Sequence, residues 1–128
     1  MENDASPVLD PDTIAELRRT KAEYRNPLLI RQLVTIYRTN APKRVEQLRH
    51  AVANADVKEL ALVAHTLKTN CAMLGALKMA ALCATLEESA DNGVVDDAAR
   101  VLAQVEDEFA RVLAALTRML ADEPGEHA

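Results

Sequence analysis

Apolar residues recur at intervals of three and four along most of this chain. The longest such series consists of Ala98, Leu102, Val105, Phe109, Val112, Leu116 and Leu120. Because an α-helix turns once in about 3.6 residues, this spacing places the apolar side chains on one face of a helix. The chain contains no Trp and only 2 Tyr, 1 Phe and 3 Gly, which leaves little material for β-sheet and its tight turns. The sequence therefore predicts an all-α fold.

Five helices are expected from this pattern and from the residues that start or interrupt helices. In chain order they cover residues 13–24, 27–54, 57–74, 76–90 and 97–121. The residues expected as N-caps are Asp12, Asn26, Asp56 and Asp96. Pro42 lies inside the second helix and should kink or break it near Asn40, because proline lacks a backbone N–H. Gly75 is expected to end or bend the third helix, and the sequence DNG at 91–93 is expected to form a turn after the fourth.

Short connections between long helices make consecutive helices antiparallel neighbours. We therefore expect an antiparallel up-and-down four-helix bundle with a short extra N-terminal helix. Residues 11–121 are expected to form this single domain, with flexible tails at 1–10 and 122–128. The sequence contains no sustained second apolar stripe, so a monomer is expected.

Composition argues against several classes of function. The formal net charge is −5, and no basic stretch with interleaved aromatic residues occurs, which argues against nucleic acid as a partner. No apolar segment approaches the roughly 20 residues needed to cross a bilayer, and the N-terminus lacks the features of a signal peptide. A cytoplasmic protein without a membrane partner is expected. Cys71 and Cys83 fall inside helical patterns and are expected to be buried, reduced thiols.

One histidine stands out in the third helix, within residues 64–76, "AHTLKTNCAMLGA". With about 100° of rotation per residue, His65 lies roughly 130° from the centre of the apolar face, on the solvent side. Lys68 lies one turn further along, where its ammonium can pair with a phosphoryl group held on the ring. Imidazole is mostly neutral at about pH 7.5, and neutral imidazole is a competent nucleophile toward phosphorus.

The surroundings of His65 on this helix leave room for a partner protein. Small side chains flank it on the same face, at Ala61, Thr69 and Ala72. Leu62 and Met73 lie still farther from the apolar face, and exposed apolar side chains beside a reactive group suggest a docking surface. The chain carries no nucleotide-binding signature, so phosphate on His65 would have to come from another protein.

The residues alone do not decide whether His65 has a function. A lone exposed histidine on a helix is most often an ordinary surface residue, and single exposed apolar residues are common. His50 is interpreted as a surface or boundary residue with no carboxylate pattern around it, and His127 lies in the C-terminal tail. A metal-dependent or hydrolytic bundle has no ligand set behind it, since no Glu-x-x-His pair and no serine-centred motif occurs.

Residues 64–88, "AHTLKTNCAMLGALKMAALCATLEE", resemble the signature of histidine-containing phosphotransfer (HPt) domains. The residues that fit the pattern are Ala64, His65, Leu67, Lys68, Cys71, Leu74, Gly75, Ala76, Leu82, Cys83, Leu86 and Glu87. The resemblance covers roughly residues 12–120 and implies a four-helix bundle. It implies that His65 is the phospho-accepting residue and that Lys68 neutralises the phosphate.

The resemblance also implies the partners. Phosphoryl exchange would occur with the aspartate of a response-regulator receiver domain, including that of a hybrid sensor kinase. The receiver would supply Mg²⁺ and a catalytic lysine, so no cofactor of the chain's own is expected. Such a domain is a phosphocarrier of a two-component phosphorelay, without autokinase or nucleotide-binding activity.

Two positions depart from the family pattern. Thr69 stands where Gly is usual, and Asn70 where Ser or Ala is usual. The Thr69 hydroxyl is expected to bond to the His65 carbonyl one turn earlier, with its methyl toward the docking surface. We expect that receiver domains can still dock beside His65, but that fewer of them are accepted. The alternative that Thr69 favours is a degenerate HPt domain, a helical module that binds a receiver or regulator without phosphotransfer.

Overall fold

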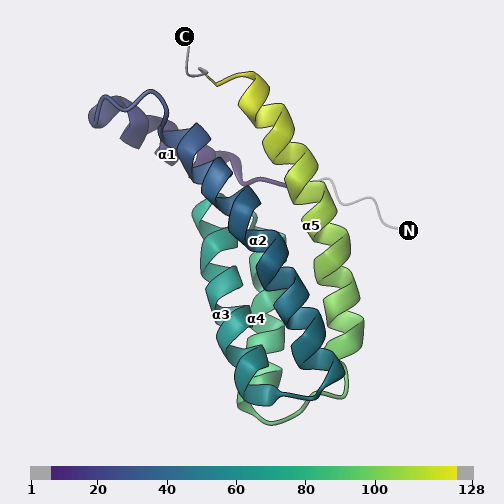
Figure 1. Cartoon of the computed structure of the whole chain (residues 1–128). Coiled ribbons are helices and arrows are strands. Elements are labelled where there is room, and N and C mark those ends of the chain that lie inside the picture. Colours follow the sequence, from purple (N-terminus) through teal and green to yellow (C-terminus); the bar gives the residue numbers. More distant parts are fainter. Residues whose placement is uncertain (1–6, 124–128) are drawn as a thin grey trace.

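The computed structural model describes residues 7–123 and is all-helical there, as the sequence predicts, with no strand in that range. Its helices are α1 (Pro11–Glu23), α2 (Leu29–Ala53), α3 (Val57–Met73), α4 (Leu77–Asp91) and α5 (Ala98–Ala121). The four longer helices pack in a closed cycle, α2 on α3, α3 on α4, α4 on α5 and α5 on α2 (Figure 1). The most extensive of these contacts joins α3 and α4, and α1 lies against α2.

Each helix of the cycle buries one face in a single apolar core. The large side chains withdrawn from solvent include Ile30, Val34, Leu48, Leu60, Leu67, Leu74, Met79, Leu86, Val105, Val112 and Leu116. Burying one side chain of this size contributes about 1.5–3 kcal/mol, so these residues supply much of the driving force for folding. The apolar series predicted in the last helix is confirmed, with Phe109 and Leu120 partly rather than fully buried.

Two thiols and a tyrosine hydroxyl lie together in the core. Cys71 and Cys83 are buried and free, which confirms the prediction for both. The Tyr37 hydroxyl lies 3.4 Å from Cys71 Sγ and 3.4 Å from Met79 Sδ. Burial raises the pKa of Tyr37, so the phenol keeps its proton and donates it to Met79 Sδ, which can only accept.

The start of α1 differs from the sequence prediction. Asp10, not Asp12, is the N-cap, and its carboxylate accepts hydrogen bonds from the Thr13 backbone N–H at 3.0 Å and the Thr13 hydroxyl at 2.7 Å. The physical reason is Pro11, which suits the first helical position because that position needs no N–H donor. The helix therefore begins two residues earlier than predicted.

The start of α2 also differs from the prediction. Asn26 is not the N-cap, because the regular helix begins at Leu29 and Leu28 takes the cap position. The Asn26 side chain instead accepts a hydrogen bond from the Leu28 N–H at 3.2 Å. Leu29 donates its N–H to the Asn26 carbonyl at 3.1 Å. The Asn26–Pro27 pair thus forms a turn that leads into the helix.

The caps of α3 and α5 contrast with each other. Asp56 caps α3 as predicted, since its side chain accepts the backbone N–H three residues on at 3.2 Å. Asp96 does not cap α5, because Asp97 takes that position and makes no side-chain capping bond. Ala98 donates its N–H to the Val95 carbonyl at 3.2 Å, so backbone rather than a carboxylate closes the entry to α5.

Pro42 does not break α2, which continues from Leu29 to Ala53. The predicted break fails because Pro42 faces solvent, where water can bond the carbonyl that loses its donor. The buried residues Tyr37, Ala41 and Val45 hold the helix against the core on both sides of the proline.

A tight link between α3 and α4 fixes how these two helices lie. α3 ends at Met73, and Gly75 follows with φ +80°, as predicted for a helix-ending glycine. The Ala76 N–H donates to the Cys71 carbonyl at 2.9 Å and closes the last turn. The Gly75 carbonyl accepts the Asp10 N–H at 2.8 Å, so the N-terminal segment is bonded to this link.

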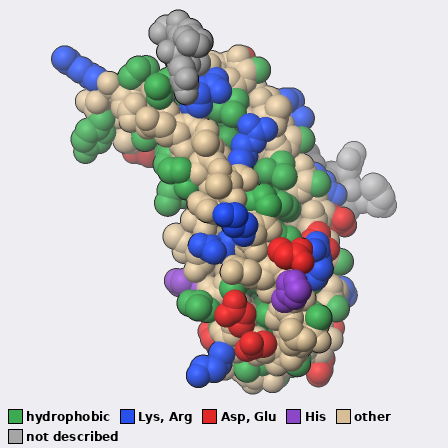
Figure 2. All heavy atoms as spheres, in the orientation of Figure 1, with side chains coloured by type: hydrophobic (Ala, Val, Ile, Leu, Met, Phe, Trp, Pro, Cys, Tyr) green, Lys and Arg blue, Asp and Glu red, His purple; other side chains and the backbone are tan. Residues whose placement is uncertain are grey.

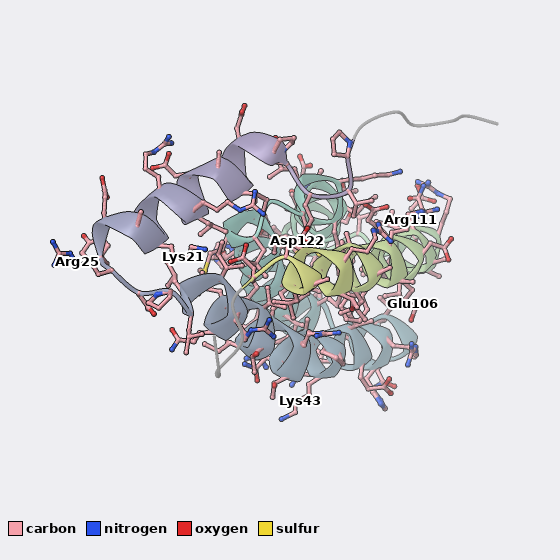
Figure 3. All side chains as sticks on the ribbon, turned by 90° about the horizontal axis from the view of Figure 1, so that it is seen from above. Lys21, Arg25, Lys43, Glu106, Arg111 and Asp122 are labelled. Atoms are coloured by element: carbon pink, nitrogen blue, oxygen red, sulfur yellow. The ribbon has the colours of Figure 1, made fainter. Side chains whose placement is uncertain are left out.

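Parts of both expected tails contact the bundle. Residues 8–9 pack against the core. Glu123 is buried and accepts a hydrogen bond from Lys21 Nζ at 3.0 Å, and Figure 3 shows Lys21 of α1 beside the end of α5. The prediction for His127 falls outside the described residues.

Gly75→Ala should destabilise the protein more than Gly93→Ala. Both glycines have positive φ, +80° and +70°, a conformation that costs alanine about 1–2 kcal/mol. At Gly75 an added Cβ would also lie 3.1 Å from the Asp10 nitrogen and from Thr13 Cβ, whereas at Gly93 it would meet open space. Urea unfolding should therefore show the larger loss of unfolding free energy for Gly75→Ala. Equal losses would contradict the packing described for the α3–α4 link.

Candidate functional site

His65 lies on the solvent face of α3, as the sequence predicts. Its side chain is 58% exposed, whereas Ala64 and Leu67 on the same helix are fully buried. The apolar face of α3 therefore anchors the helix in the core and holds the imidazole outside it. The ring is accessible to a partner protein.

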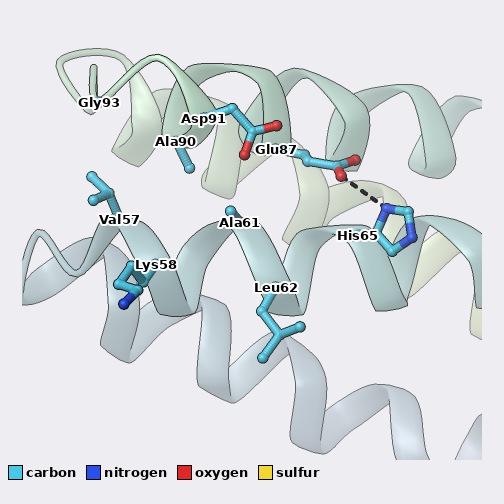
Figure 4. A pocket seen from close by; sticks show the side chains of 9 residues that line it. All are labelled: Val57, Lys58, Ala61, Leu62, His65, Glu87, Ala90, Asp91 and Gly93. Atoms are coloured by element: carbon cyan, nitrogen blue, oxygen red, sulfur yellow. Dashed lines mark hydrogen bonds and ion pairs between the residues drawn. The ribbon is translucent and has the colours of Figure 1, made fainter.

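Glu87 of α4 joins His65 to Lys68 through a single carboxylate. Its Oε2 lies 2.8 Å from His65 Nδ1, the contact drawn as a dashed line in Figure 4. Its Oε1 lies 2.7 Å from Lys68 Nζ. The two α3 residues are three apart, so they project from the same side of the helix toward α4. The close packing of α3 on α4 brings the carboxylate within reach of both.

This carboxylate determines which ring nitrogen carries a proton. The Lys68 hydrogen bond is the main influence that lowers the pKa of Glu87, with a smaller contribution from His65, so the group is ionised at neutral pH. An ionised carboxylate can only accept hydrogen bonds, so Nδ1 must be the donor. In the neutral ring the lone pair is then on Nε2. Nε2 points away from Glu87 and makes no hydrogen bond within residues 7–123.

Lys68 lies beside His65 as expected, but Glu87 occupies its ammonium. The helix wheel missed this because it places residues on one helix only, and Glu87 comes from the next. The one available signal was the sequence "LEE", in which Glu87 fits the family signature, although the resemblance implies no role for it. Glu87 is therefore the site residue that sequence reasoning missed.

A shallow groove of about 610 Å³ runs beside His65 between α3 and α4 (Figure 4). It is lined by Val57, Lys58, Ala61, Leu62, His65, Glu87, Ala90, Asp91 and Gly93. Leu62 is 64% exposed although it is a large apolar residue. The structure thus brings Ala61 and Leu62, two of the predicted docking residues, together with the imidazole.

The other predicted docking residues lie toward the opposite end of α3. Thr69, Ala72 and Met73 are exposed but do not line the groove. The Thr69 hydroxyl donates to the His65 carbonyl at 3.2 Å, which confirms the predicted bond. Because this bond occupies the hydroxyl, Thr69 changes the surface beside His65 mainly through its bulk.

His50 is exposed on α2, as predicted. The sequence interpretation that no carboxylate surrounds it is wrong, because Glu46 Oε2 lies 3.1 Å from His50 Nε2. Glu46 is four residues earlier on the same helix, so ordinary helix geometry accounts for the pair. This contact occupies the Nε2 atom that is unbonded in His65.

Charge on the face of the molecule in Figure 2 is of both signs, with acidic side chains gathered toward the end where α2 meets α3. This face shows no continuous basic surface. Across residues 7–123, no three His, Cys, Asp or Glu side chains are grouped so that they could hold a metal ion. In the same part of the chain, no helix has both the length and the hydropathy to cross a bilayer.

Lys68→Gln should raise the pKa of Glu87 toward its ordinary value, since it removes the hydrogen bond that lowers that pKa most. Carbon-detected NMR of the Glu87 carboxyl group would measure the change, with Lys58→Gln as a control from the same groove. A depressed folded-state pKa stabilises the fold above the unfolded pKa of about 4.3 and loses that effect as pH falls. The stability difference between wild type and Lys68→Gln should therefore shrink below about pH 5. An unchanged Glu87 titration would contradict the bridge.

Comparison with known proteins assigns the family. Residues 32–115 match the Hpt domain family. The solved structure of histidine-containing phosphotransfer protein B from Pseudomonas aeruginosa PAO1 is similar, with a TM-score of 0.76 and 30% identity over 90% of this chain and 96% of that chain. No curated protein matches the sequence. The chain therefore belongs to the HPt domain family, the helical-bundle phosphocarriers of two-component phosphorelays that interact with response-regulator receiver domains.

Proposed function

We propose that this domain carries phosphoryl groups between receiver domains and accepts them on Nε2 of His65. The observation that carries the proposal is the pairing of an exposed ring with Glu87, which holds Nδ1 at 2.8 Å while Nε2 points away. The Glu87 contact supplies the tautomer that a nucleophilic Nε2 requires. Exposure of the ring supplies access for the partner.

The proposed reaction needs little from this chain beyond the ring. The Nε2 lone pair attacks the phosphorus of a receiver aspartyl phosphate, and the P–O bond breaks with its electron pair passing to the aspartate carboxylate. A second receiver takes the group in the reverse manner, and the N–P electron pair returns to Nε2. No proton moves at Nε2 in either direction. Mg²⁺ and a catalytic lysine would come from the receiver, and this chain would need no cofactor or nucleotide.

Docking of the receiver is proposed along the groove beside His65. Leu62 and Ala61 offer an apolar contact next to the reacting atom. Lys58 on one wall and Asp91 on the other give the groove opposite charges, which would favour one orientation of the partner. Thr69, exposed one turn beyond His65, borders the approach and would narrow the choice of receivers.

The proposal also includes the topology of the helices and the oligomeric state. The links between the helices are short, and the four longer helices pack in a closed cycle. Both features favour an antiparallel up-and-down four-helix bundle with α1 as an addition. A monomer in the cytoplasm fits a carrier that must visit more than one receiver.

A second candidate function is receiver binding without phosphotransfer. The observation that favours it is the engagement of Lys68 by Glu87, which leaves the lysine occupied before any phosphate arrives. In that case Leu62 and the groove would still bind a receiver or regulator. The two candidates differ in whether His65 ever holds phosphate.

His65→Gln should abolish phosphate uptake from a phosphorylated receiver and leave the bundle folded, because His65 contributes nothing to the core. The label on wild-type protein should be acid-labile and base-stable, as expected for an N–P bond. His50→Gln is the matched control, an exposed helical histidine that should take up label normally. Label that persists in His65→Gln contradicts the assignment. Receiver binding with no label in wild type supports the second candidate.

Leu62→Ala should weaken receiver binding roughly tenfold, which corresponds to about 1.4 kcal/mol of lost apolar contact. Ile36→Ala is the control, because Ile36 is similarly exposed, at 58% against 64%, but lies on α2. Isothermal titration of each variant with the receiver measures the effect. Equal affinities for both variants would place docking elsewhere.

A further inference from the structure

We propose that the Glu87 carboxylate controls how readily His65 gives up its phosphoryl group, acting as a positioning residue through two separate contacts. The inference rests on the proposed function and concerns the stored phosphoryl group rather than its acceptance. It follows from the position of one carboxylate between the imidazole and the ammonium.

The first contact acts on the ring. Once Nε2 holds phosphorus, the ring is a good leaving group only if Nδ1 keeps its proton, because neutral imidazole then departs. If that proton is lost, the N–P bond must break to give an imidazolate, which is far less favourable. Glu87 Oε2, 2.8 Å from Nδ1, stabilises the proton on Nδ1 and the positive charge of the phosphorylated ring. This contact therefore keeps the phosphoryl group labile.

The second contact acts on the lysine. Lys68 is the nearest cation on α3 that could stabilise a phosphoryl group on His65, and Glu87 Oε1 holds it at 2.7 Å. A phosphoryl group adds about 1.5 to 2 negative charges and must compete with the carboxylate for that ammonium. The carboxylate also repels the new charge across the site. Both effects raise the free energy of the phosphorylated form.

The position of Glu87 makes both contacts persistent. Its side chain is only 20% exposed, and both of its oxygens are engaged by α3, one by His65 and the other by Lys68. The other charged groups in the groove are Lys58 from α3 and Asp91 from α4. Within residues 7–123, neither shares a hydrogen bond with the ring or with Lys68. The rate at which His65 loses its phosphoryl group should therefore depend on Glu87 more than on any other charged group in the groove.

The test measures the lifetime of phosphohistidine on the full chain without any receiver. Phosphoramidate labels the protein directly: the Nε2 lone pair attacks phosphorus, the P–N bond breaks, and ammonia leaves. After the reagent is removed, the loss of phosphate to water is followed from pH 6 to 9. Glu87→Gln removes the charge and retains the shape, and Glu88→Gln is the control at the exposed neighbouring residue.

Glu87→Gln should lose phosphate roughly three- to tenfold more slowly than wild type near neutral pH, the effect expected for one lost charge-assisted hydrogen bond. The pH at which loss slows should also move downward, since Nδ1 holds its proton less well. Adding Lys68→Gln to Glu87→Gln should reverse part of the gain, because the released lysine is then absent. Glu88→Gln should behave as wild type.

Equal lifetimes and equal pH profiles in wild type and Glu87→Gln overturn the inference, and so does a wild-type chain that phosphoramidate cannot label at His65. Circular dichroism of each variant verifies that it is folded. Failure of the proposed function looks different. In that case labelled protein shows the Glu87 effect on lifetime but neither takes phosphate from a receiver nor delivers it to one.

Discussion

The packing of α3 against α4 is the constraint on which the site depends. The contact between these two helices is the most extensive in the bundle, and both helices bury small side chains, among them Ala64, Ala80 and Cys83, which favour close packing. The link at Gly75 closes in a tight turn and is itself bonded to the N-terminal segment. As a result a glutamate on one helix meets a histidine and a lysine on the other. The geometry of the site is thus a product of the core beneath it.

A single carboxylate then performs two tasks that would otherwise need two groups. One oxygen directs the proton to Nδ1 and so leaves a lone pair on Nε2, while the other pairs with Lys68. In the structure, the carboxylate and the ammonium of this ion pair offset each other's charge. In the phosphorylated form that we propose, the same carboxylate would oppose the new negative charge. Such a balance would suit a carrier that has to accept a phosphoryl group and also release it.

The sequence predicts the helices and the exposed histidine because both depend on spacing within one segment. The apolar series in α5 and the solvent position of His65 follow from the helical repeat alone. The Glu87 bridge does not, because it depends on the distance between two helices and on their register. The cap errors at Asp12 and Asp96 have a local cause, since several acidic residues stand near each helix start and neighbouring backbone decides among them.

We propose that phosphate resides on Nε2 of His65 while Nδ1 keeps its proton and donates it to Glu87 in a hydrogen bond. NMR of the phosphorylated protein with ¹⁵N-labelled histidine, observed through ¹⁵N and ³¹P, locates both the phosphorus and the proton. Phosphorus should couple to Nε2, and a proton bound to Nδ1 should be present in wild type and lost or shifted in Glu87→Gln. Phosphorus coupled to Nδ1, or phosphate on a residue other than His65, would show that the proposed site is wrong.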